Sequence, residues 1–240
     1  YVVDTVAFEG PFLHDLSGAL GFEPYLNFSS KMRDVLEQKG KEILENFKEA
    51  CKMAGIESDT ILDSGIVSNQ ICEESKIADI IVMGRKGINV SFEHGLLGST
   101  TEGVIRKAPK PVMIVSDKYE EIRKPLLVYN GSFSSSRVMR TAAEFAKVLA
   151  LPLTALIVSR GKNEGLLNEA EEYFKPYELE VKYVTLENKV PADIVTYIDS
   201  ELHDLVFLGA SGHGKLVERV LGGTTEFVLR NLEKPIILER

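Results

Sequence analysis

The stretch DIIVMGRKG at residues 79–87 returns as DLVFLGASG at residues 204–212. The segments that follow are repeated as well: LLGSTTEGVI (96–105) as VLGGTTEFVL (220–229), and KPVMI (110–114) as KPIIL (234–238). Matching positions lie 124 or 125 residues apart throughout. Self-similarity at one fixed interval indicates a duplicated domain, so each feature of the chain can be interpreted twice.

Each copy has the element order of a parallel α/β unit. Five or six apolar residues, rich in β-branched types and too few for a helix, end at Gly84 or Gly209, which is typical of a buried parallel strand. A polar loop with glycine follows, and an amphipathic helix opens at Gly98 or Gly222. A Lys-Pro pair ends that helix, and a second apolar strand closes the unit.

These elements together are suited to an anion. Glycine permits positive φ and lets backbone amides approach a ligand closely. A helix that starts at Gly98 or Gly222 would direct its unpaired N–H groups, and the positive end of its dipole, toward the end of the preceding strand. The repeated segment therefore predicts a phosphate site in each copy.

The pattern G-x-x-G, nine or ten residues, then G-(S/T) resembles the nucleotide-binding signature of universal stress proteins. In the second copy nine residues separate Gly212 from Gly222, as in the family, but Gly223 stands where the family usually has Ser or Thr. In the first copy Ser99 is present, but the interval before Gly98 is ten residues. The resemblance implies two doubly wound, five-strand parallel-sheet domains in tandem, similar to adenine nucleotide alpha hydrolases.

The resemblance also implies a ligand and its contacts. The ligand would be an adenine nucleotide (ATP, ADP or AMP), with Mg²⁺ as an optional companion, between the first and fourth strands of a domain. Asn130, where the family commonly has Asp, would contact the nucleoside, and the backbone of Val158 or Val3 would contact adenine. The phosphates would lie against Gly84, Gly87, Gly98, Ser99 and Thr100, or against Gly209, Gly212, Gly222, Gly223 and Thr224.

Several of these residues also have plainer interpretations. Asn130-Gly131 suits an ordinary turn between a strand and a helix. Hydroxyl residues at helix starts are often N-caps, which applies to Ser99, Thr100 and Thr224. Their recurrence beside the glycines favours contact with phosphate.

Dedicated catalysis has little support in the sequence. Gly209-x4-Gly214-Lys215 resembles a P-loop, but Leu216 occupies the position that needs Ser or Thr for Mg²⁺. The serines at residues 132–136 suit helix caps rather than nucleophiles. No carboxylate pair or clustered histidines indicate a general base or a metal site. Slow ATP hydrolysis or phosphotransfer is the most that we expect.

The two copies define domains at residues 1–121 and 122–240, joined by a charged linker at residues 117–124. The second half predicts five strands (126–129, 153–158, 179–186, 205–209, 236–239) and helices at 134–149, 165–175 and 191–202 besides the one after Gly222. The first half predicts an insertion at 9–28, a long helix at about 30–54, a strand near Ile61 and a helix near Ile71. It lacks an opening strand and helix, so we expect roughly 35–40 further residues before Tyr1, as a complete unit requires.

Composition narrows the class of protein. The chain has 240 residues, 44% of them hydrophobic, and a net charge of −8. No run approaches the roughly 18 apolar residues of a membrane helix, and the negative charge disfavours nucleic acid as a partner. Cys51 and Cys72 lie in expected helices without metal-ligand spacing, which suits a reducing cytoplasm.

Two functions follow as alternatives. One is a regulatory module that binds an adenine nucleotide, and the other is a nucleotide-independent stress protein that acts as an interaction scaffold. In either case the fifth strands, 112–115 and 236–239, need cover for their outer edges. We therefore expect the halves to form an intramolecular pseudo-dimer through these strands, with a further homodimer left open.

Overall fold

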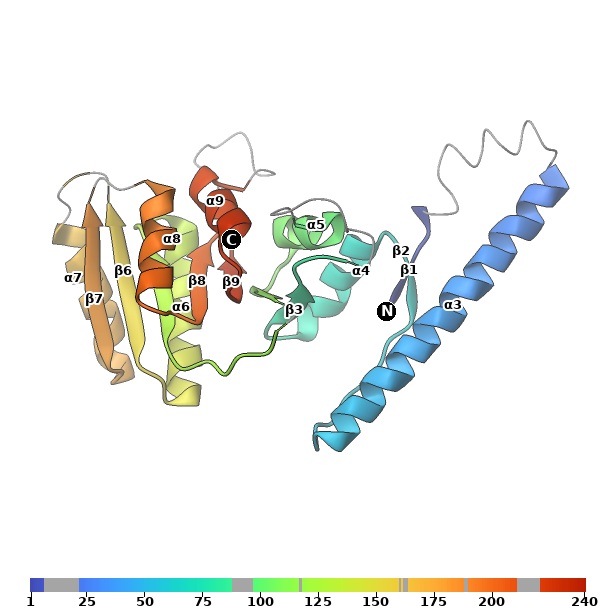
Figure 1. Ribbon diagram of the computed structural model, residues 1–240, viewed down its shortest axis with the longest axis horizontal. Helices are drawn as coiled ribbons and strands as arrows, with labels where there is room; N and C mark the ends of the chain where they lie inside the picture. Colours follow the sequence, from blue (N-terminus) through green and yellow to red (C-terminus); the bar gives the residue numbers. More distant parts are fainter. Residues whose placement is uncertain are drawn as a thin grey trace. The chain divides into compact units, whose positions relative to one another are not determined.

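The computed structural model describes residues 1–6, 22–87, 97–116, 118–159, 161, 164–187, 190–210 and 221–240, without the side chains of residues 22–29 and 164. The chain divides into two compact units, Tyr1–Glu74 and Ser75–Arg240 (Figure 1). This division concerns compactness alone, and the boundary between the repeats at residues 121 and 122 remains a prediction.

The first unit contains β1 (Val2–Asp4), α3 (Phe22–Met53), β2 (Asp63–Gly65) and α4 (Val67–Glu74). β1 and β2 are parallel, with Val3 opposite Ser64. The expected long helix is present but begins at Phe22, so the last part of the predicted insertion is helical. Pro24 does not prevent this because it falls in the first turn, where its missing N–H would have no partner within the helix.

The second unit is built on one seven-stranded sheet in the order β3-β4-β9-β8-β5-β6-β7. Its neighbouring strands are parallel except for β4 and β9. The strands are β3 (Ile81–Gly84), β4 (Val112–Val115), β5 (Pro125–Tyr129), β6 (Leu153–Ser159), β7 (Val181–Glu187), β8 (Leu205–Gly209) and β9 (Ile236–Glu239). The order of the last five strands is that of a doubly wound domain, with its switch point between β5 and β8.

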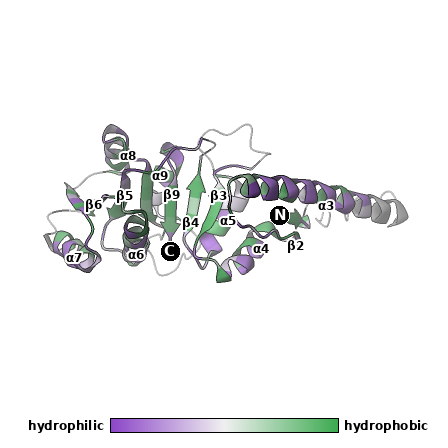
Figure 2. Ribbon diagram, turned by 90° about the horizontal axis from the view of Figure 1, so that it is seen from below, coloured by the Kyte–Doolittle hydropathy of each residue, from purple (hydrophilic) through white to green (hydrophobic). Residues whose placement is uncertain are grey.

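Helices cover both faces of this sheet. They are α5 (Ser99–Lys107), α6 (Phe133–Leu149), α7 (Glu164–Phe174), α8 (Pro191–Ser200) and α9 (Gly223–Asn231), with short 3₁₀ turns at Ser75–Ile77 and Lys175–Tyr177. Figure 2 shows α6 and α7 on one side of β5 to β9, and α8 and α9 on the other. The predicted α/β class with a mostly parallel sheet is confirmed.

Alternate residues of the strands form the core beneath α6. Leu127 and Tyr129 of β5 and Phe207 of β8 are completely buried in one cluster with Ala142 and Ala146 of α6. Alanine at these helix positions lets α6 lie close to large side chains of the sheet. This packing fixes where α6 begins, and therefore what surrounds the end of β8.

The pairing of β4 with β9 joins the two halves. Met113 lies opposite Ile237, with Val112 opposite Leu238 on one side and Ile114 opposite Ile236 on the other (Figure 2). Exchanging each residue for its repeat counterpart reproduces the same pairs, so the contact has the pattern of a two-fold axis between Met113 and Ile237. The expected pairing of the fifth strands is therefore present.

The first half contributes fewer strands than a complete five-strand domain. β3 and β4 correspond to β8 and β9, whereas β1 and β2 correspond to β6 and β7. The described residues contain no counterpart of β5, which agrees with the missing opening strand in the sequence. Of the first domain, four strands are thus described, and they are divided between two sheets.

The segment between the halves has no helix or strand over residues 118–124. Its end is bound to the second half, because the Asp204 carboxylate accepts hydrogen bonds from the N–H groups of Arg123 (2.7 Å) and Lys124 (2.9 Å). Among the helices that the structure describes, none is long and apolar enough to cross a bilayer.

Candidate functional site

Glycine ends one strand in each half, as the sequence predicts. Gly84 is the last residue of β3 and Gly209 is the last residue of β8. Asn130 directly follows β5, which pairs with β8 so that Val128 lies opposite Leu208. In the second half, Asn130 and Ala210 therefore lie beside one another at the edge where the two strands end.

The helices α5 and α9 open with the same backbone. Their N-caps are Gly98, with φ −63° and ψ 146°, and Gly222, with φ −61° and ψ 146°. Within the described part of the chain, no side chain caps either helix. Ser99, Thr100 and Thr224 thus lie inside the helices and do not act as N-caps, so the plainer interpretation of these residues is wrong. The first N–H groups of both helices are left for water or an anion.

A buried threonine ties each helix to its strand. The Thr101 hydroxyl donates a hydrogen bond to the Gly84 carbonyl (3.1 Å), and the Thr225 hydroxyl donates to the Gly209 carbonyl (2.8 Å). Both threonines are buried. Sequence reasoning did not select them as site residues, although the repeated G-(S/G)-T-T segment contains them in both copies. They position the helix N-terminus and leave Thr100 and Thr224 half-exposed.

The glycines differ in what surrounds them. A Cβ added at Gly87 or Gly223 would meet no described atom within 4 Å. At Gly98 it would lie 3.3 Å from the backbone nitrogen of Gly87, so the loop and the helix start approach each other closely. At Gly209 it would lie 2.6 Å from the Ser134 hydroxyl. Packing alone therefore explains Gly209 but does not explain Gly87 or Gly223.

The turn after β5 uses the Asn130 side chain internally. Its Oδ1 accepts a hydrogen bond from the Ser132 N–H (3.1 Å), Gly131 has φ +73°, and the Ser132 hydroxyl caps α6 by accepting from the Ser135 N–H. A Cβ on Gly131 would lie 2.5 Å from Leu166, so glycine is required here for both conformation and space. The interpretation of Asn130-Gly131 as a strand-to-helix turn describes this geometry well. It leaves Asn130 exposed at the sheet edge.

The remaining predicted residues are less clearly placed together. Val158 is half-buried next to the end of β6, and Ile157 beside it lies opposite Tyr129, so Val158 shares the edge with Asn130. Val3 is buried in β1 of the first compact unit, apart from the unit that contains Gly84. Gly212 and the P-loop-like Lys215 lie outside the described residues.

Charges near the helix starts are already paired. Glu102 and Glu226 lie in the first turns of α5 and α9, where a carboxylate would repel an anion. Each forms an ion pair with an arginine four residues later, Glu102 with Arg106 and Glu226 with Arg230. The pairs draw both carboxylates toward the middle of their helices, because residues four apart lie on one face.

Glu239 is a buried charge that sequence reasoning missed. It ends β9 opposite Gly209, and its side chain is only 2% exposed. The Thr141 hydroxyl donates to its Oε2 (2.7 Å), and the Arg137 Nε lies 3.3 Å from its Oε1. Both partners belong to α6, so this cluster helps to hold α6 against the end of β8 and β9.

Arg85 does not take the role that its place in the loop indicates. The sequence offers it as a basic residue for a small anion. Its guanidinium instead donates to the carbonyl of Leu229 and lies 3.4 Å from that of Lys234, both in the second half. Burial lowers the pKa of Arg85, while the Glu233 carboxylate acts in the opposite direction.

Comparison with known proteins places this geometry in a family. The model of the "Universal stress protein family" matches residues 19–116 and 160–240, more than half of the chain. The chain belongs to the universal stress protein family.

Other universal stress proteins resemble it over different lengths. Slr1230 from Synechocystis is 27% identical, and the match covers 100% of this chain and 88% of the relative. MJ0531 from Methanocaldococcus jannaschii is 37% identical over 90 residues, which cover 37% of this chain and 52% of the relative. A universal stress protein structure from Archaeoglobus fulgidus superposes with a TM-score of 0.71 at 24% identity, covering 86% of this chain and 78% of that one. The structural likeness supports the fold.

Proposed function

We propose that this universal stress protein is a regulatory module that binds an adenine nucleotide. In each half the phosphates would lie against the N-terminus of α5 or α9. In the second half the nucleoside would lie toward Asn130 and Val158. The observation that carries the proposal is the identical, uncapped glycine start of two helices, each beside a strand that ends in glycine.

The physical argument concerns the first turn of each helix. Its N–H groups have no partner within the helix, and the helix dipole adds partial positive charge at the same place. Thr101 and Thr225 hold this turn to the strand end, so the donors are fixed before a ligand arrives. Phosphate oxygens would accept these hydrogen bonds, each contributing about 1.5–3 kcal/mol because the acceptor is charged.

Gly87 and Gly223 support the same conclusion. Neither is required by the packing of the described protein atoms, yet both lie where a side chain would project into the space before the helix. A bound phosphate explains why that space is left free. The Mg²⁺ that accompanies ATP would bind to the phosphates.

The proposal is tested by calorimetric titration of ATP and AMP into the wild-type chain, Gly87→Val, Gly223→Val and Gly87→Val/Gly223→Val. Each single substitution should remove binding at its own half or weaken it by about tenfold or more, since one or two charged hydrogen bonds are lost. The double variant should show no binding. Circular dichroism should show unchanged secondary structure, because the added side chains meet no described atom.

Asn231→Ala is the matched control. Asn231 is the last residue of α9, and its side chain donates only to the Phe227 carbonyl of its own helix among its printed contacts. The affinity for ATP should stay at the wild-type value in this variant. Gly209→Ala is unsuitable as a probe, because its Cβ would collide with Ser134 and alter the fold.

One observation favours the scaffold alternative. The Asn130 carbonyl oxygen already accepts the Ser132 N–H, so it is less available to a ribose hydroxyl. If neither ATP nor AMP binds the wild-type protein at millimolar concentration, the nucleotide proposal fails and the scaffold function is favoured. If binding persists unchanged in the double variant, the phosphate positions proposed here are wrong.

A further inference from the structure

The starts of α5 and α9 lie at opposite edges of the seven-stranded sheet. β3 is parallel to β4, β4 is antiparallel to β9, and β9 is parallel to β8. The end of β3 therefore lies at the edge where β8 begins. α9 returns from the end of β8 to that same edge, so the first-half loop lies where α9 ends.

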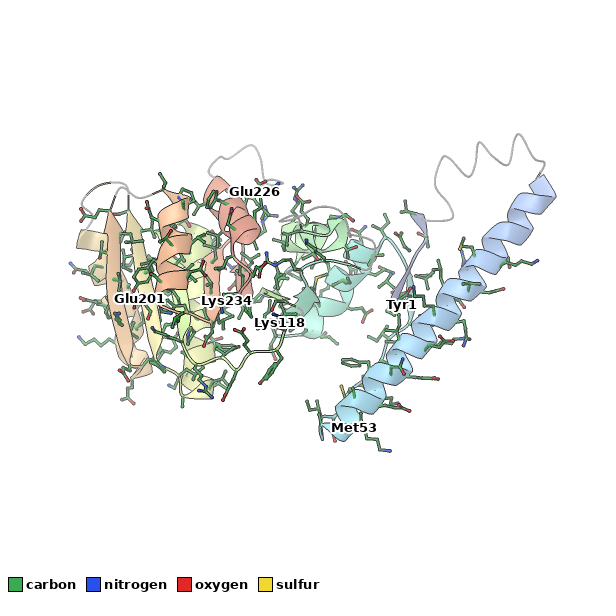
Figure 3. The ribbon with its side chains drawn as sticks, in the orientation of Figure 1. Tyr1, Met53, Lys118, Glu201, Glu226 and Lys234 are labelled. Carbon is green, nitrogen blue, oxygen red and sulfur yellow. The ribbon has the colours of Figure 1, made fainter. Side chains whose placement is uncertain are left out.

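Arg85 converts this proximity into a contact. Its main chain belongs to the first-half loop, because its N–H donates to the Val115 carbonyl (3.2 Å) and its carbonyl accepts the Gly98 N–H (3.1 Å). Its guanidinium reaches the Leu229 carbonyl in the last turn of α9 and the Lys234 carbonyl just beyond it. In Figure 3, the labelled residues Glu226 and Lys234 mark the two ends of this helix region.

Arg240 makes the converse contact. It follows Glu239, whose carbonyl accepts the N–H of Ala210 (2.8 Å) at the start of the second-half loop. Its guanidinium donates to the Arg106 carbonyl in the last turn of α5. The contacts are reciprocal although the donors are not equivalent in the repeat, since the counterparts of Arg85 and Arg240 are Ala210 and Ser116.

A guanidinium is well suited to this position. The last turn of a helix has free carbonyl groups and partial negative charge, which a cation stabilises, more strongly when the pair is partly buried. Arg85 is half-buried. The helix between the two contacts has nine residues and is about 13 Å long, so its first and last turns are joined by one short, hydrogen-bonded element.

We propose that Arg85 and Arg240 couple the two nucleotide sites, so that a nucleotide bound at one helix N-terminus raises the affinity of the other site. This inference rests on the proposed function. A phosphate at the start of α9 would order that helix, its last turn would hold Arg85 more firmly, and the Arg85 main chain would order the first-half loop. The second ligand would then have less ordering to bring about. Arg85 and Arg240 are positioning residues, because neither touches the ligand.

The coupling can be measured with ATP and the full chain. Gly87→Val leaves the second-half site and Gly223→Val leaves the first-half site, so each gives the association constant of one site alone. The coupling factor is the product of the two wild-type stepwise constants divided by the product of these single-site constants. We expect a factor of about five or more. It should fall toward one when the three measurements are repeated with Arg85→Gln, and keep its value with Asn231→Ala.

Two results of this titration would overturn the coupling. One is a factor of one in the wild-type protein, and the other is an unchanged factor in the Arg85→Gln background. Arg85→Lys keeps a positive donor without the fork of a guanidinium, so it should restore only part of the factor. Full loss of the factor in Arg85→Gln with partial recovery in Arg85→Lys would support the contact described here.

Hydrogen exchange of the nucleotide-free protein separates this inference from the proposed function. Arg85→Gln should speed the exchange of the Gly98 N–H, which donates to Arg85. It should also speed exchange of the Glu226 N–H, which donates to Gly222 at the other end of α9. Asn231→Ala should not change the exchange of Gly98. Unchanged exchange at Glu226 would overturn the link. Faster exchange without any ATP binding would overturn the proposed function and leave the link supported.

Discussion

Thr225 joins the start of α9 to the end of β8 through one buried hydrogen bond, and the valine substitution tests its contribution. Thr225→Val keeps the shape of the side chain but removes the donor to the Gly209 carbonyl. We expect the free energy of unfolding to fall by about 1–3 kcal/mol, the cost of a buried acceptor without its partner. Urea unfolding measures this change. Thr224→Val, one residue earlier and half-exposed, is the control and should cost clearly less; equal losses would contradict the role given to Thr225.

At the same scale, the sequence could predict which residues gather but not what each one does. The repeat selected Gly84, Gly87, Gly98 and Gly209, and the structure places them at strand ends, in the loop and at a helix start. Glycine has no side chain to distinguish a free space from a tight one, so only coordinates separate Gly87 from Gly209. The contacts of Arg85 could not be predicted, because they depend on a helix 144 residues away along the chain.

β4 and β9 form the contact between the repeats, and its apolar pairs determine its strength. Ile114 and its partner Ile236 are completely buried. Ile114→Ala should lower the free energy of unfolding by about 2–5 kcal/mol, since it removes buried methyl groups and leaves a cavity. Denaturant titration followed by circular dichroism measures the loss. Val82→Ala on β3 is the control, because Val82 is 59% exposed and should cost under about 1 kcal/mol. Similar losses for the two variants would argue against this seam.

Most elements could be predicted because the pattern of each is local. The strands at residues 112–115, 205–209 and 236–239 have the predicted bounds, and α6 begins one residue earlier than expected. The start of α3 was wrong because Pro24 and the preceding glycines indicate a loop, whereas proline is tolerated in a first helical turn. Polarity between β4 and β9 needed the repeat and the edge argument together, since neither strand sequence contains its direction.

For the whole second unit, His203 makes stability depend on pH. The side chain is 1% exposed, its Nδ1 lies 3.0 Å from the Lys124 carbonyl, and burial lowers its pKa below the usual 6.5. The unfolded chain therefore binds the proton more readily than the folded one. The stabilisation from neutral His203 is fully present above pH 6.5 and is lost as the pH falls from there through the folded pKa.

His203→Asn isolates this contribution. Asparagine can place an amide N–H near the position of Nδ1 and does not titrate. The wild-type free energy of unfolding should decrease between about pH 7 and pH 5, and the decrease should be smaller in the variant. Urea unfolding at a series of pH values gives both curves. Parallel curves for wild type and variant would show that His203 does not carry the dependence.

The two-fold pattern of the β4–β9 pair is the pattern by which two separate, identical subunits would meet. Between separate subunits, such a contact is lost on dilution. Here both strands belong to one polypeptide, and residues 116–124 keep them within reach of each other at a high effective concentration. The assembly of the second unit is therefore independent of how much of the protein a cell contains. Duplication within one chain also frees each copy to change by itself, which explains how Ser99 in one half can face Gly223 in the other without loss of the shared sheet.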